Sequence, residues 1–544
     1  MKRRALVWAG LALFAAIYAV ATFRVLLRST ADVTAARDRK TTVRFAHFYL
    51  EPGLREAYAQ IAADYMRLHP GVEVEQIAVP QRIFNAWAKT QLIGGTSPDL
   101  VLVDGGQFTL EDLARHFTPL HEWVESPNPY NAATPAAGLP WRETFIDGLT
   151  GSYDSRLLSY YSIPTSLFTN RVFYNRALWR EIFGTESPPA DYEAFRAACA
   201  AIEAWGATHD QPLVPLAGSV YNTPFLIDFL FGTQTQRRQF EVAWSAHLRA
   251  DLSPSVALLQ GRWNFHDPAL QSAFRLVRDI GQHIQPGFLQ LQRDDANFAF
   301  LQGRTVMLVS GAHEAASLRA QADFPLGVFA LPVPGPGHPV YGAQMLGPVT
   351  EANIRPAGAF GLTRASRAPE QAVDFLRFLT SQATAARFAA LSGWLTAVAD
   401  APVPAELKPF QPVTAGYANG FDLSIRRRHP DAKRVADTNL HLLLAATSDA
   451  QTVAAYTAAL ERDYVPALRL DLQSRTANTR RNVMRQDGNL AAYRWLARAA
   501  PDDAVLARKF NEVAEQIDGN EAENYFILHE LARTAAGANP PARP

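Results

Sequence analysis

The chain has very little cysteine. Cys199 is the only cysteine among 544 residues, which excludes a disulfide within the chain and a cysteine-rich metal site. There is also no excess of charge, because 52 basic residues balance 52 acidic ones. Nucleic-acid binding needs a basic field over many phosphates, so this composition gives it no support. Cys199 shares an apolar helical stripe with Phe195 and Ile202, which predicts a buried core thiol.

Recognisable catalytic motifs are missing as well. The sequence has no G-x-S-x-G, no H-E-x-x-H, no phosphate-binding P-loop and no Cys/His cluster. Asp294 and Asp295 are adjacent carboxylates, but neighbours on a helix point in different directions, so we expect a helix cap there. His266 and Asp267 precede Pro268 and predict another helix start. We therefore expect no catalytic residues, no cofactor and no metal site.

Long apolar runs are rare, and the run that is long enough to cross a bilayer stands at the N-terminus. Ala5–Phe23 carries no formal charge over nineteen residues and follows the basic cluster Lys2–Arg4. This charge order keeps the N-terminus in the cytoplasm and exports the body of the chain. A signal-peptidase site at Ala19–Ala21 would give a soluble exported protein, whereas the length of the apolar run favours an uncleaved anchor. We assign 1–28 to this signal peptide or anchor and 29–41 to a linker.

Alternating strand and helix patterns are abundant in the first part of the exported body. They follow the order strand, helix, strand, helix, strand over residues 41–50, 54–68, 72–79, 84–92 and 100–103. The first helix carries Leu54, Tyr58, Ile61 and Tyr65 on one face. This order predicts an α/β fold with a parallel sheet covered by helices.

The last part of the chain has a different pattern. Helical spacing fills residues 438–533, with Leu506, Phe510 and Val513 on one amphipathic stripe. We assign 476–536 to an extra α-helical tail and expect 537–544 to be disordered.

Four stretches, taken in order, carry a resemblance to a known family. They are "VRFAHFYLEPGLREAYAQIAADYMRLHPGVEVEQIAV" with "GGTSPDLVLVD", "YYSIPTSLFTNRVFYNRALWREIFG", "NFAFLQGRTVMLVSGAH", and "PAGAFGLTRASRAPEQAVDFLRFLTSQATAARFAALSGWL". Together they span residues 42 to 475 and resemble extracellular solute-binding proteins of family 1, the maltose-binding-protein-like receptors of ABC importers. Residues 126–150 and the tail have no counterpart in this resemblance.

The resemblance implies a two-lobed periplasmic-binding-protein-like fold of type II, which closes on a ligand about a hinge. We expect the chain to cross between lobes near 160–164, near 358–363 and after Trp394. The predicted domains are lobe 1 over 42–163 and 358–395, and lobe 2 over 164–357 and 396–475, followed by the tail. The tail is expected to pack on lobe 2 as added structure, or else to bind a partner.

Ligand-binding residues are expected beyond the carboxyl ends of the strands, where loops of an open α/β sheet face the crevice. Asp104 ends the strand of "SPDLVLVDGG", and its carboxylate could accept hydrogen bonds from sugar hydroxyls. The alternative is that Asp104 caps the helix near Thr109 or holds a turn. His47, Phe48 and Tyr49 leave the first strand toward the same crevice, where Phe48 would stack on a sugar or belong to the core.

The resemblance places further ligand contacts in lobe 2 and at the return hinge. These candidates are Asn170, Tyr221, Asn222, Gly311, His313 and Trp394. The family usually has an aromatic residue, commonly Trp, where His313 stands, and the smaller imidazole weakens that sugar platform. Tyr341, Gln344 and Met345 are candidates to compensate for the smaller ring.

These features predict a substrate-binding protein of an ABC importer that captures a carbohydrate or oligosaccharide and delivers it to a membrane permease. Its expected partners are the small solute, the permease subunits and the cytoplasmic membrane through residues 5–23. We expect it to be periplasmic. A membrane-anchored sensor or scaffold that is not dedicated to transport is the alternative, and an exported hydrolase is the least supported function.

Overall fold

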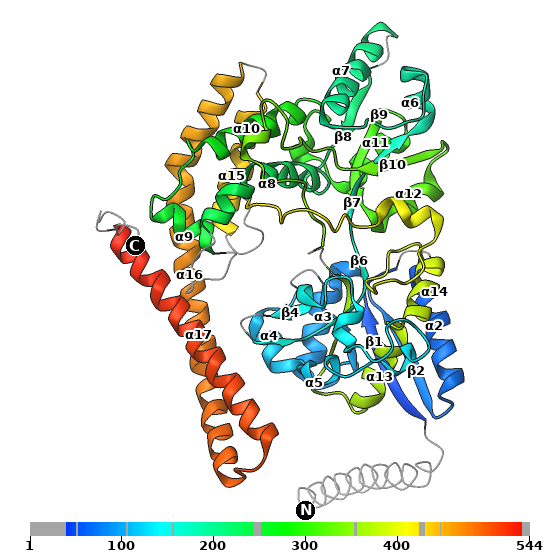
Figure 1. Cartoon of the computed structure of the whole chain (residues 1–544), viewed down its shortest axis with the longest axis vertical. Coiled ribbons are helices and arrows are strands. Elements are labelled where there is room, and N and C mark those ends of the chain that lie inside the picture. The colour runs from blue at the N-terminus through cyan, green and yellow to red at the C-terminus, as the bar shows by residue number, and fades with distance from the viewer. Residues whose placement is uncertain are drawn as a thin grey trace, which may run out of the picture.

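A computed structural model of the protein describes residues 40–50, 53–104, 107–154, 157–209, 212–242, 252–352, 356–423, 430–445 and 448–535. The predicted leader, 1–28, and the predicted disordered end, 537–544, lie outside these residues. Within the described ranges, no helix has both the length and the apolar character that a membrane crossing requires. Figure 1 shows two α/β lobes, one above the other, with a long helical hairpin beside them.

The lower lobe in Figure 1, lobe 1, is built on a five-stranded sheet of order β2-β1-β3-β11-β6. Its strands are β1 (Thr41–His47), β2 (Val72–Ala78), β3 (Leu100–Leu102), β6 (Ile163–Leu167) and β11 (Pro356–Leu362). β1 pairs in parallel with β2 and β3, and β11 runs antiparallel between β3 and β6. The predicted first strand–helix unit is therefore confirmed, and a strand from late in the sequence completes the sheet.

Helices cover both faces of this sheet. They are α2 (Leu54–Leu68), α3 (Gln81–Gly94), α4 (Leu110–His116), α5 (His121–Val124), α13 (Pro369–Leu379) and α14 (Gln382–Ser392). The predicted stripe of α2 is buried as expected, since Leu54, Tyr58, Ile61 and Tyr65 belong to the lobe 1 core. Residues 126–154 add the short turns η3 (Pro129–Asn131), η4 (Trp141–Thr144) and η5 (Thr150–Ser152) and the strand β4 (Tyr153–Asp154), which pairs with β5 (Ser159–Tyr160).

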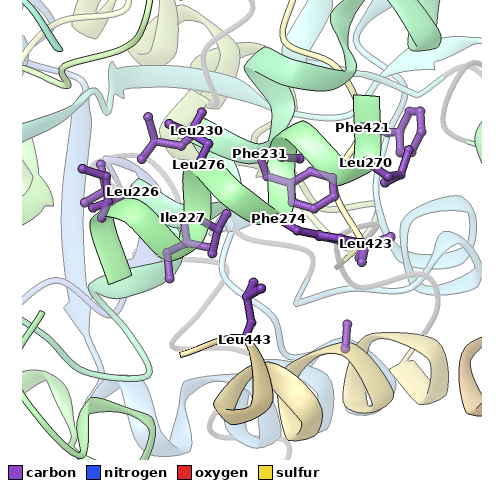
Figure 2. Packing of buried hydrophobic residues seen from close by; sticks show 14 of the residues in the cluster. Leu226, Ile227, Leu230, Phe231, Leu270, Phe274, Leu276, Phe421, Leu423 and Leu443 are labelled. Carbon is purple, nitrogen blue, oxygen red and sulfur yellow. The ribbon is translucent and has the colours of Figure 1, made fainter. Parts of the chain in front are cut away.

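Lobe 2 has a four-stranded sheet of order β10-β7-β9-β8. Its strands are β7 (Asn170–Asn175), β8 (Val214–Ala217), β9 (Thr305–Gly311) and β10 (Leu326–Ala330), and its first helices are α6 (Arg176–Phe183), α7 (Tyr192–Thr208), α8 (Thr223–Val242), α9 (Ser253–Leu259), α10 (Pro268–Gly281), α11 (Arg293–Leu301) and α12 (Ala315–Gln321). Figure 2 shows α8 residues such as Leu230 packing with Phe274 of α10 and Leu443 in the lobe 2 core. Cys199 is buried in this core as predicted, and burial raises the pKa of its thiol.

The predicted helix caps are confirmed. Asp267 accepts a hydrogen bond from the backbone N–H of Ala269 at the start of α10. The carboxylate of Asp295 accepts one from the backbone N–H of Gln292 at the start of α11. Asp295 therefore stabilises a helix end, since a side-chain acceptor satisfies a donor that the helix itself leaves free.

The lobe boundaries differ in detail from the prediction. We expected the first crossing at 160–164, but β6 still pairs with β11 in the lobe 1 sheet up to Leu167, so the chain crosses at Phe168 and Thr169. The return strand β11 begins two residues before the predicted 358. After Trp394 the chain stays beside lobe 1, because the backbone N–H of Ala397 donates to the carbonyl of Thr165. It joins the lobe 2 side at η9 (Ala405–Phe410), where Phe410 packs on Phe173.

The predicted helical tail is part of longer helices. After α15 (Pro430–Leu443), α16 (Asp449–Ala499) runs unbroken through the predicted boundary at 475, and α17 (Ala504–Ala535) returns alongside it. We call α16 and α17 the helical hairpin. Buried residues such as Ile527 and Leu531 pack in the lobe 2 core, as the first alternative for the tail expects.

The hairpin also touches lobe 1, which the sequence did not predict. Arg508 forms an ion pair with Glu122 at 2.5 Å, and the side-chain amide of Gln516 donates to the carbonyl of Leu157 at 2.6 Å. A cavity of about 690 Å³ lies between lobe 1 and the hairpin; its lining includes Ala114, Trp123, Tyr161, Tyr493, Lys509 and Val513. The hairpin therefore bridges the two lobes at a distance from the hinge strands.

Candidate functional site

Strand topology brings the ends of several strands together where the lobes meet. In lobe 1, β1 ends before Phe48 and β6 ends before Phe168. In lobe 2, Asn170 at the start of β7 pairs with Gly311 at the end of the antiparallel strand β9, so both lie on one sheet edge. β8 is parallel to β9, so the loop after β8, residues 218–222, reaches the same edge. This edge is where an open α/β fold binds ligands.

Aromatic side chains form a continuous row across this junction. Ring centroids lie 4.7 Å apart for Phe48 and Tyr49, and 5.0 Å apart for Tyr49 and Trp394. Trp394 meets Phe168 at 5.0 Å, and Phe168 meets His313 of lobe 2 at 4.5 Å. The row ends at Tyr221, whose hydroxyl lies 3.2 Å from Nε2 of His313. We call these residues the interlobe aromatic row: Phe48, Tyr49, Phe168, Tyr221, His313 and Trp394.

Exposure differs along the row. Tyr221 is 38% exposed, and Phe48, Phe168 and His313 are half-buried, so these rings present free surface at the junction. Trp394 and Tyr49 are buried, at 3% and 4% exposed. The buried pair therefore supports the rings that a ligand can reach. Phe168 was not among the predicted residues, because its position at a lobe crossing depends on where β6 ends.

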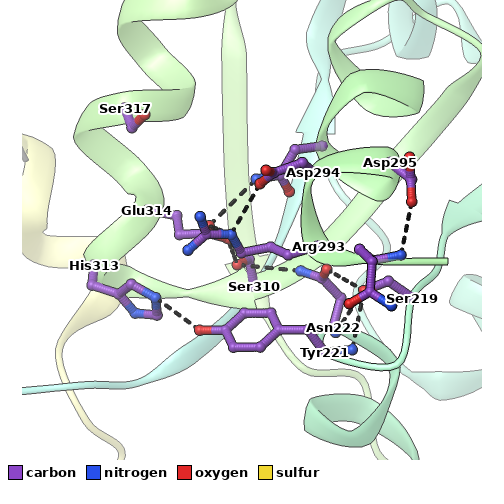
Figure 3. Close-up of polar contacts among 12 residues, drawn as sticks. Ser219, Tyr221, Asn222, Arg293, Asp294, Asp295, Ser310, His313, Glu314 and Ser317 are labelled. Carbon is purple, nitrogen blue, oxygen red and sulfur yellow. Dashed lines mark hydrogen bonds and ion pairs between the residues drawn. The ribbon is translucent and has the colours of Figure 1, made fainter. Parts of the chain in front are cut away.

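His313 lies beside Tyr221 (Figure 3), and its ring packs against Gly311. A Cβ atom on Gly311 would lie 2.4 Å from the His313 ring, so only glycine leaves room for the ring in this position. Burial lowers the pKa of His313, although the neighbouring Glu314 carboxylate opposes that shift. Its Nδ1 atom is buried without a hydrogen-bond partner in the described part of the chain. The chain thus packs closely between Gly311 and the imidazole of His313.

A polar cluster that the sequence did not predict lies beside Tyr221. The guanidinium of Arg293 stands 5.8 Å from the centre of the Tyr221 ring and 3.6 Å from Glu314. Glu314 is buried and accepts hydrogen bonds from Ser310 and, at 3.3 Å, from Asn297. Figure 3 shows Arg293 between Glu314 and Tyr221. A cation on a ring face is a favourable contact, so Arg293 holds the Tyr221 ring in place. It also places a positive charge beside the Glu314 carboxylate at this sheet edge.

The two predicted asparagines have different surroundings. Asn222 is fully buried, accepts a hydrogen bond from Ser219 at 2.7 Å and donates to the carbonyl of Val309 at 3.0 Å. It therefore holds the loop that carries Tyr221 against β9. Asn170 is half-buried at the sheet edge, and its side-chain amide has no hydrogen-bond partner among the described residues.

Asp104 has a different set of partners from the one expected. It is buried, and its two oxygens accept hydrogen bonds from the backbone N–H groups of Gly358 and Ala359, each at 2.8 Å. The hydroxyl of Tyr49 donates to the same carboxylate. The alternative of a cap near Thr109 is also not observed, because the hydroxyl of Thr109 itself accepts from the N–H of Asp112. Asp104 links the end of β3 to β11. In this arrangement its carboxylate is occupied within lobe 1, so it affects a ligand only by positioning Tyr49 and strand β11.

His47 lies in the lobe 1 core and not at the junction. It is fully buried, its Nδ1 accepts a hydrogen bond from the backbone N–H of Tyr49 at 3.1 Å, and its Nε2 lies 2.8 Å from the side-chain amide of Gln76. Burial lowers the pKa of His47 from 6.5 to about 4. His47 therefore positions Phe48 and Tyr49 as a neutral imidazole.

We expect acid to destabilise lobe 1 through His47. The folded pKa lies below the unfolded value, so the stabilising contribution is complete above pH 6.5 and is lost as pH falls toward 4. The full loss corresponds to about 3 kcal/mol in the free energy of unfolding. Denaturation midpoints measured across this range should fall less steeply in His47→Gln than in the wild type. The exposed control His209→Gln should keep the wild-type slope, and an unchanged slope in His47→Gln would contradict this role.

Tyr341 and Gln344 lie apart from the aromatic row. The hydroxyl of Tyr341 donates to Asp279 of α10, and its ring stacks on His338 at 5.1 Å. Gln344 ends the short turn η8 (Gly342–Gln344), and the carbonyl of the next residue, Met345, accepts a hydrogen bond from Arg237 near the end of α8. These contacts belong to the body of lobe 2, so we leave this segment out of the candidate site.

No group of three or more His, Cys, Asp or Glu side chains in the described ranges is arranged to hold a metal ion. The exposed rings, the free amide of Asn170 and the polar cluster of Arg293 and Glu314 are suited to an organic, hydrogen-bonding guest. Aromatic faces cover apolar C–H surface, and the polar groups around them fix orientation.

The family model of bacterial extracellular solute-binding proteins matches residues 60–410, well over half of the chain. No curated protein sequence matches this chain. The apo form of RafE from Streptococcus pneumoniae has a TM-score of 0.55 at 16% identity, over 79% of this chain and 98% of RafE. A chitin oligosaccharide binding protein has 0.50 at 16%, over 78% and 99%, and the GacH receptor of Streptomyces glaucescens has 0.50 at 16%, over 78% and 98%. These likenesses show the fold, and the family match shows that the chain belongs to the bacterial extracellular solute-binding proteins, which are solute receptors and not enzymes.

Proposed function

We propose that the protein captures a carbohydrate or oligosaccharide between its lobes and delivers it to the permease of an ABC importer. The observation that carries this proposal is the interlobe aromatic row, which joins rings from lobe 1, the crossing segment and lobe 2. A sugar stacked on these rings buries its C–H faces and leaves its hydroxyls free for polar partners.

The polar groups beside the row match the needs of such hydroxyls. The side-chain amide of Asn170 has no partner among the described residues, and Tyr221 is 38% exposed, with its hydroxyl 3.2 Å from Nε2 of His313. None of these groups is an unpaired charge, which favours an uncharged guest over an ionic one. Contacts to both lobes are complete only when the lobes approach each other, so the ligand shifts the population toward the closed form.

The structural relatives support a sugar. RafE was also solved in complex with raffinose, another relative is named for chitin oligosaccharides, and GacH was solved in complex with acarbose. All three ligand types are hydroxyl-rich and can stack on aromatic side chains. Their proteins share only the fold with this chain, so the solute must be identified by experiment.

A thermal-shift screen with raffinose, acarbose, maltodextrins and chitin oligosaccharides tests the proposal on the full chain. A ligand that binds only the folded state stabilises it by about 2.7 kcal/mol at one hundred times its Kd, which is a readily measured rise in Tm. Calorimetry should then show saturable binding, and the recovered sugar should be unchanged. Absence of a shift across a broad sugar panel, together with a shift by charged solutes, would contradict the carbohydrate assignment.

We expect substitutions in the exposed part of the row to weaken binding of the sugar found in that screen. Tyr221→Ala or Phe168→Ala should each raise Kd at least about tenfold, because each removes a stacking face worth about 1.4 kcal/mol or more. Isothermal titration measures the change. Tyr525→Ala removes an exposed tyrosine from the helical hairpin, away from the row, and should leave Kd at the wild-type value. Wild-type affinity in both row variants would place the ligand elsewhere.

A membrane-anchored sensor that does not serve transport is the second candidate. The contacts of the hairpin with both lobes favour it, because they make a surface on which lobe closure could be sensed. Cells that lack the protein distinguish the two candidates: loss of uptake of the identified sugar supports the importer, whereas normal uptake supports the sensor. Sequencing the N-terminus of the mature protein decides between an anchor and cleavage after Ala21.

A further inference from the structure

The end of the helical hairpin carries exposed apolar side chains. Trp495 is 73% exposed, Leu496 49% and Val505 43%, and all three flank the connection between Ala499 and Ala504. We call these three residues the hairpin tip. A tryptophan exposed to this extent has no packing function in its own chain, and exposed apolar side chains that gather at one place mark an interaction surface.

The same end of the hairpin is basic, although the whole chain is neutral. Residues 480–509 contain seven basic residues and three acidic ones. The basic residues are Arg480, Arg481, Arg485, Arg494, Arg498, Arg508 and Lys509, and the acidic ones are Asp487, Asp502 and Asp503. Arg508 pairs with Glu122 of lobe 1, and Lys509 lines the cavity between lobe 1 and the hairpin, so five basic residues remain against three acidic ones. The excess of positive charge at this end therefore attracts a negatively charged partner.

The described chain begins at the same end of the molecule. Figure 1 shows the start of β1 and the hairpin tip at the lower end of the protein, on either side of lobe 1. Sixteen residues, 24–39, lie between the apolar run Ala5–Phe23 and Lys40, and they span at most about 55 Å when fully extended. If that run lies in the bilayer, as its sequence predicts, Lys40 at the lower end of the protein stays within about 55 Å of the membrane.

We propose that the hairpin tip inserts Trp495, Leu496 and Val505 into the interface of a bilayer that contains anionic lipids. Tryptophan prefers this interface because its ring is apolar and its N–H reaches the headgroups. Lys and Arg side chains near an anionic surface add attraction that falls with salt. Arg494 and Arg498 lie in the same last turns of α16 as Trp495 and supply that charge. The contact adds a second attachment point beside the N-terminal segment and orients the receptor on the membrane.

Site-specific lipid quenching on the full chain tests this proposal. Cys199 is fully buried, so Trp495→Cys and, separately, Tyr525→Cys each give one reactive thiol for an environment-sensitive fluorescent label. Tyr525 is 75% exposed on the same hairpin but lies in the part of α17 that packs on lobe 2, which makes it a matched control. The labelled proteins are mixed with vesicles of phosphatidylcholine and phosphatidylglycerol, or of phosphatidylcholine alone, that contain lipids with brominated acyl chains.

We expect brominated lipids to quench the label at position 495 by roughly a factor of two or more in anionic vesicles and to leave the label at position 525 unchanged. Arg494→Glu with Arg498→Glu should weaken this quenching at least about tenfold when vesicles are titrated, and added salt should weaken it in the wild type. Equal quenching at both positions, or equal quenching in neutral and anionic vesicles, would overturn the proposal. No quenching at position 495 in any vesicle would also overturn it and would assign the tip to a protein partner.

Discussion

Arg171→Met is expected to lower the free energy of unfolding by about 3–5 kcal/mol, because it breaks a buried ion pair by removing one partner. Arg171 of β7 is 2% exposed and donates two hydrogen bonds to the carboxylate of Glu351, at 2.7 and 3.0 Å. It also donates to the carbonyls of Pro409 and Gln411 at 2.9 and 2.7 Å. Three segments distant in sequence are therefore joined by one side chain at the lobe 2 end of the crossing.

Denaturation with guanidinium, followed by tryptophan fluorescence, measures this loss. The double variant Arg171→Met with Glu351→Met should recover part of it, because two apolar side chains replace the pair without leaving a buried charge. Arg196→Met removes an arginine that is 42% exposed and pairs with Asp279 at 3.1 Å, and it should cost less than about 1 kcal/mol. A loss in Arg171→Met no larger than in Arg196→Met would contradict the assigned role.

Asp104→Ala is expected to lower the free energy of unfolding by about 2–4 kcal/mol at pH 8. The substitution leaves the N–H groups of Gly358 and Ala359 and the hydroxyl of Tyr49 without their acceptor, and an unsatisfied buried donor costs about 1–3 kcal/mol. Tyr49→Phe removes one donor from the same cluster and should cost about 1 kcal/mol. If Asp104→Ala were as stable as Tyr49→Phe, the carboxylate would not be the link between β3 and β11.

The same residue makes a prediction about pH. Burial raises the pKa of Asp104 from 3.8 to about 6, although the hydrogen bonds from Tyr49 and the two N–H groups oppose this shift. Between these values the folded chain holds a proton that the unfolded chain has lost. The contribution of Asp104 is therefore complete below pH 3.8 and declines as pH rises through 6, by up to about 3 kcal/mol.

The stability difference between the wild type and Asp104→Ala should accordingly be larger at pH 4 than at pH 8. His47 acts in the opposite direction over nearly the same range, because its folded pKa lies below its unfolded value. The two groups partly offset each other in the wild type, so each effect is measured on its own variant. A constant difference between pH 4 and pH 8 would contradict the raised pKa of Asp104.

Local features of this protein were predictable from the sequence. The stripe on α2, the buried position of Cys199 and the caps at Asp267 and Asp295 are all observed, because each depends on residues a few positions apart. The order of strands and helices was also sufficient to predict an α/β fold with a parallel sheet, and the two lobes followed from the resemblance to a known family. The spacing of apolar and capping residues within one element determines these features, and that spacing can be read directly from the sequence.

The candidate site was predictable only in part. The sequence placed Asp104 and His47 at strand ends, but their partners are other parts of lobe 1 and not an open surface. The acceptor role of Asp104 depends on Gly358, which lies 254 residues further along the chain. Phe168 and Arg293 were missed, since nothing near them in sequence marks them as neighbours of Trp394 and Tyr221.

The sequence by itself determined the helices and strands, their buried faces and their order, because apolar spacing and capping act over a few residues. Only the tertiary structure decided that β11 returns beside β3, that the aromatic row crosses from Phe48 to Tyr221, and that the hairpin reaches lobe 1. Contacts between segments hundreds of residues apart depend on how whole sheets and helices pack, and no local pattern specifies that packing.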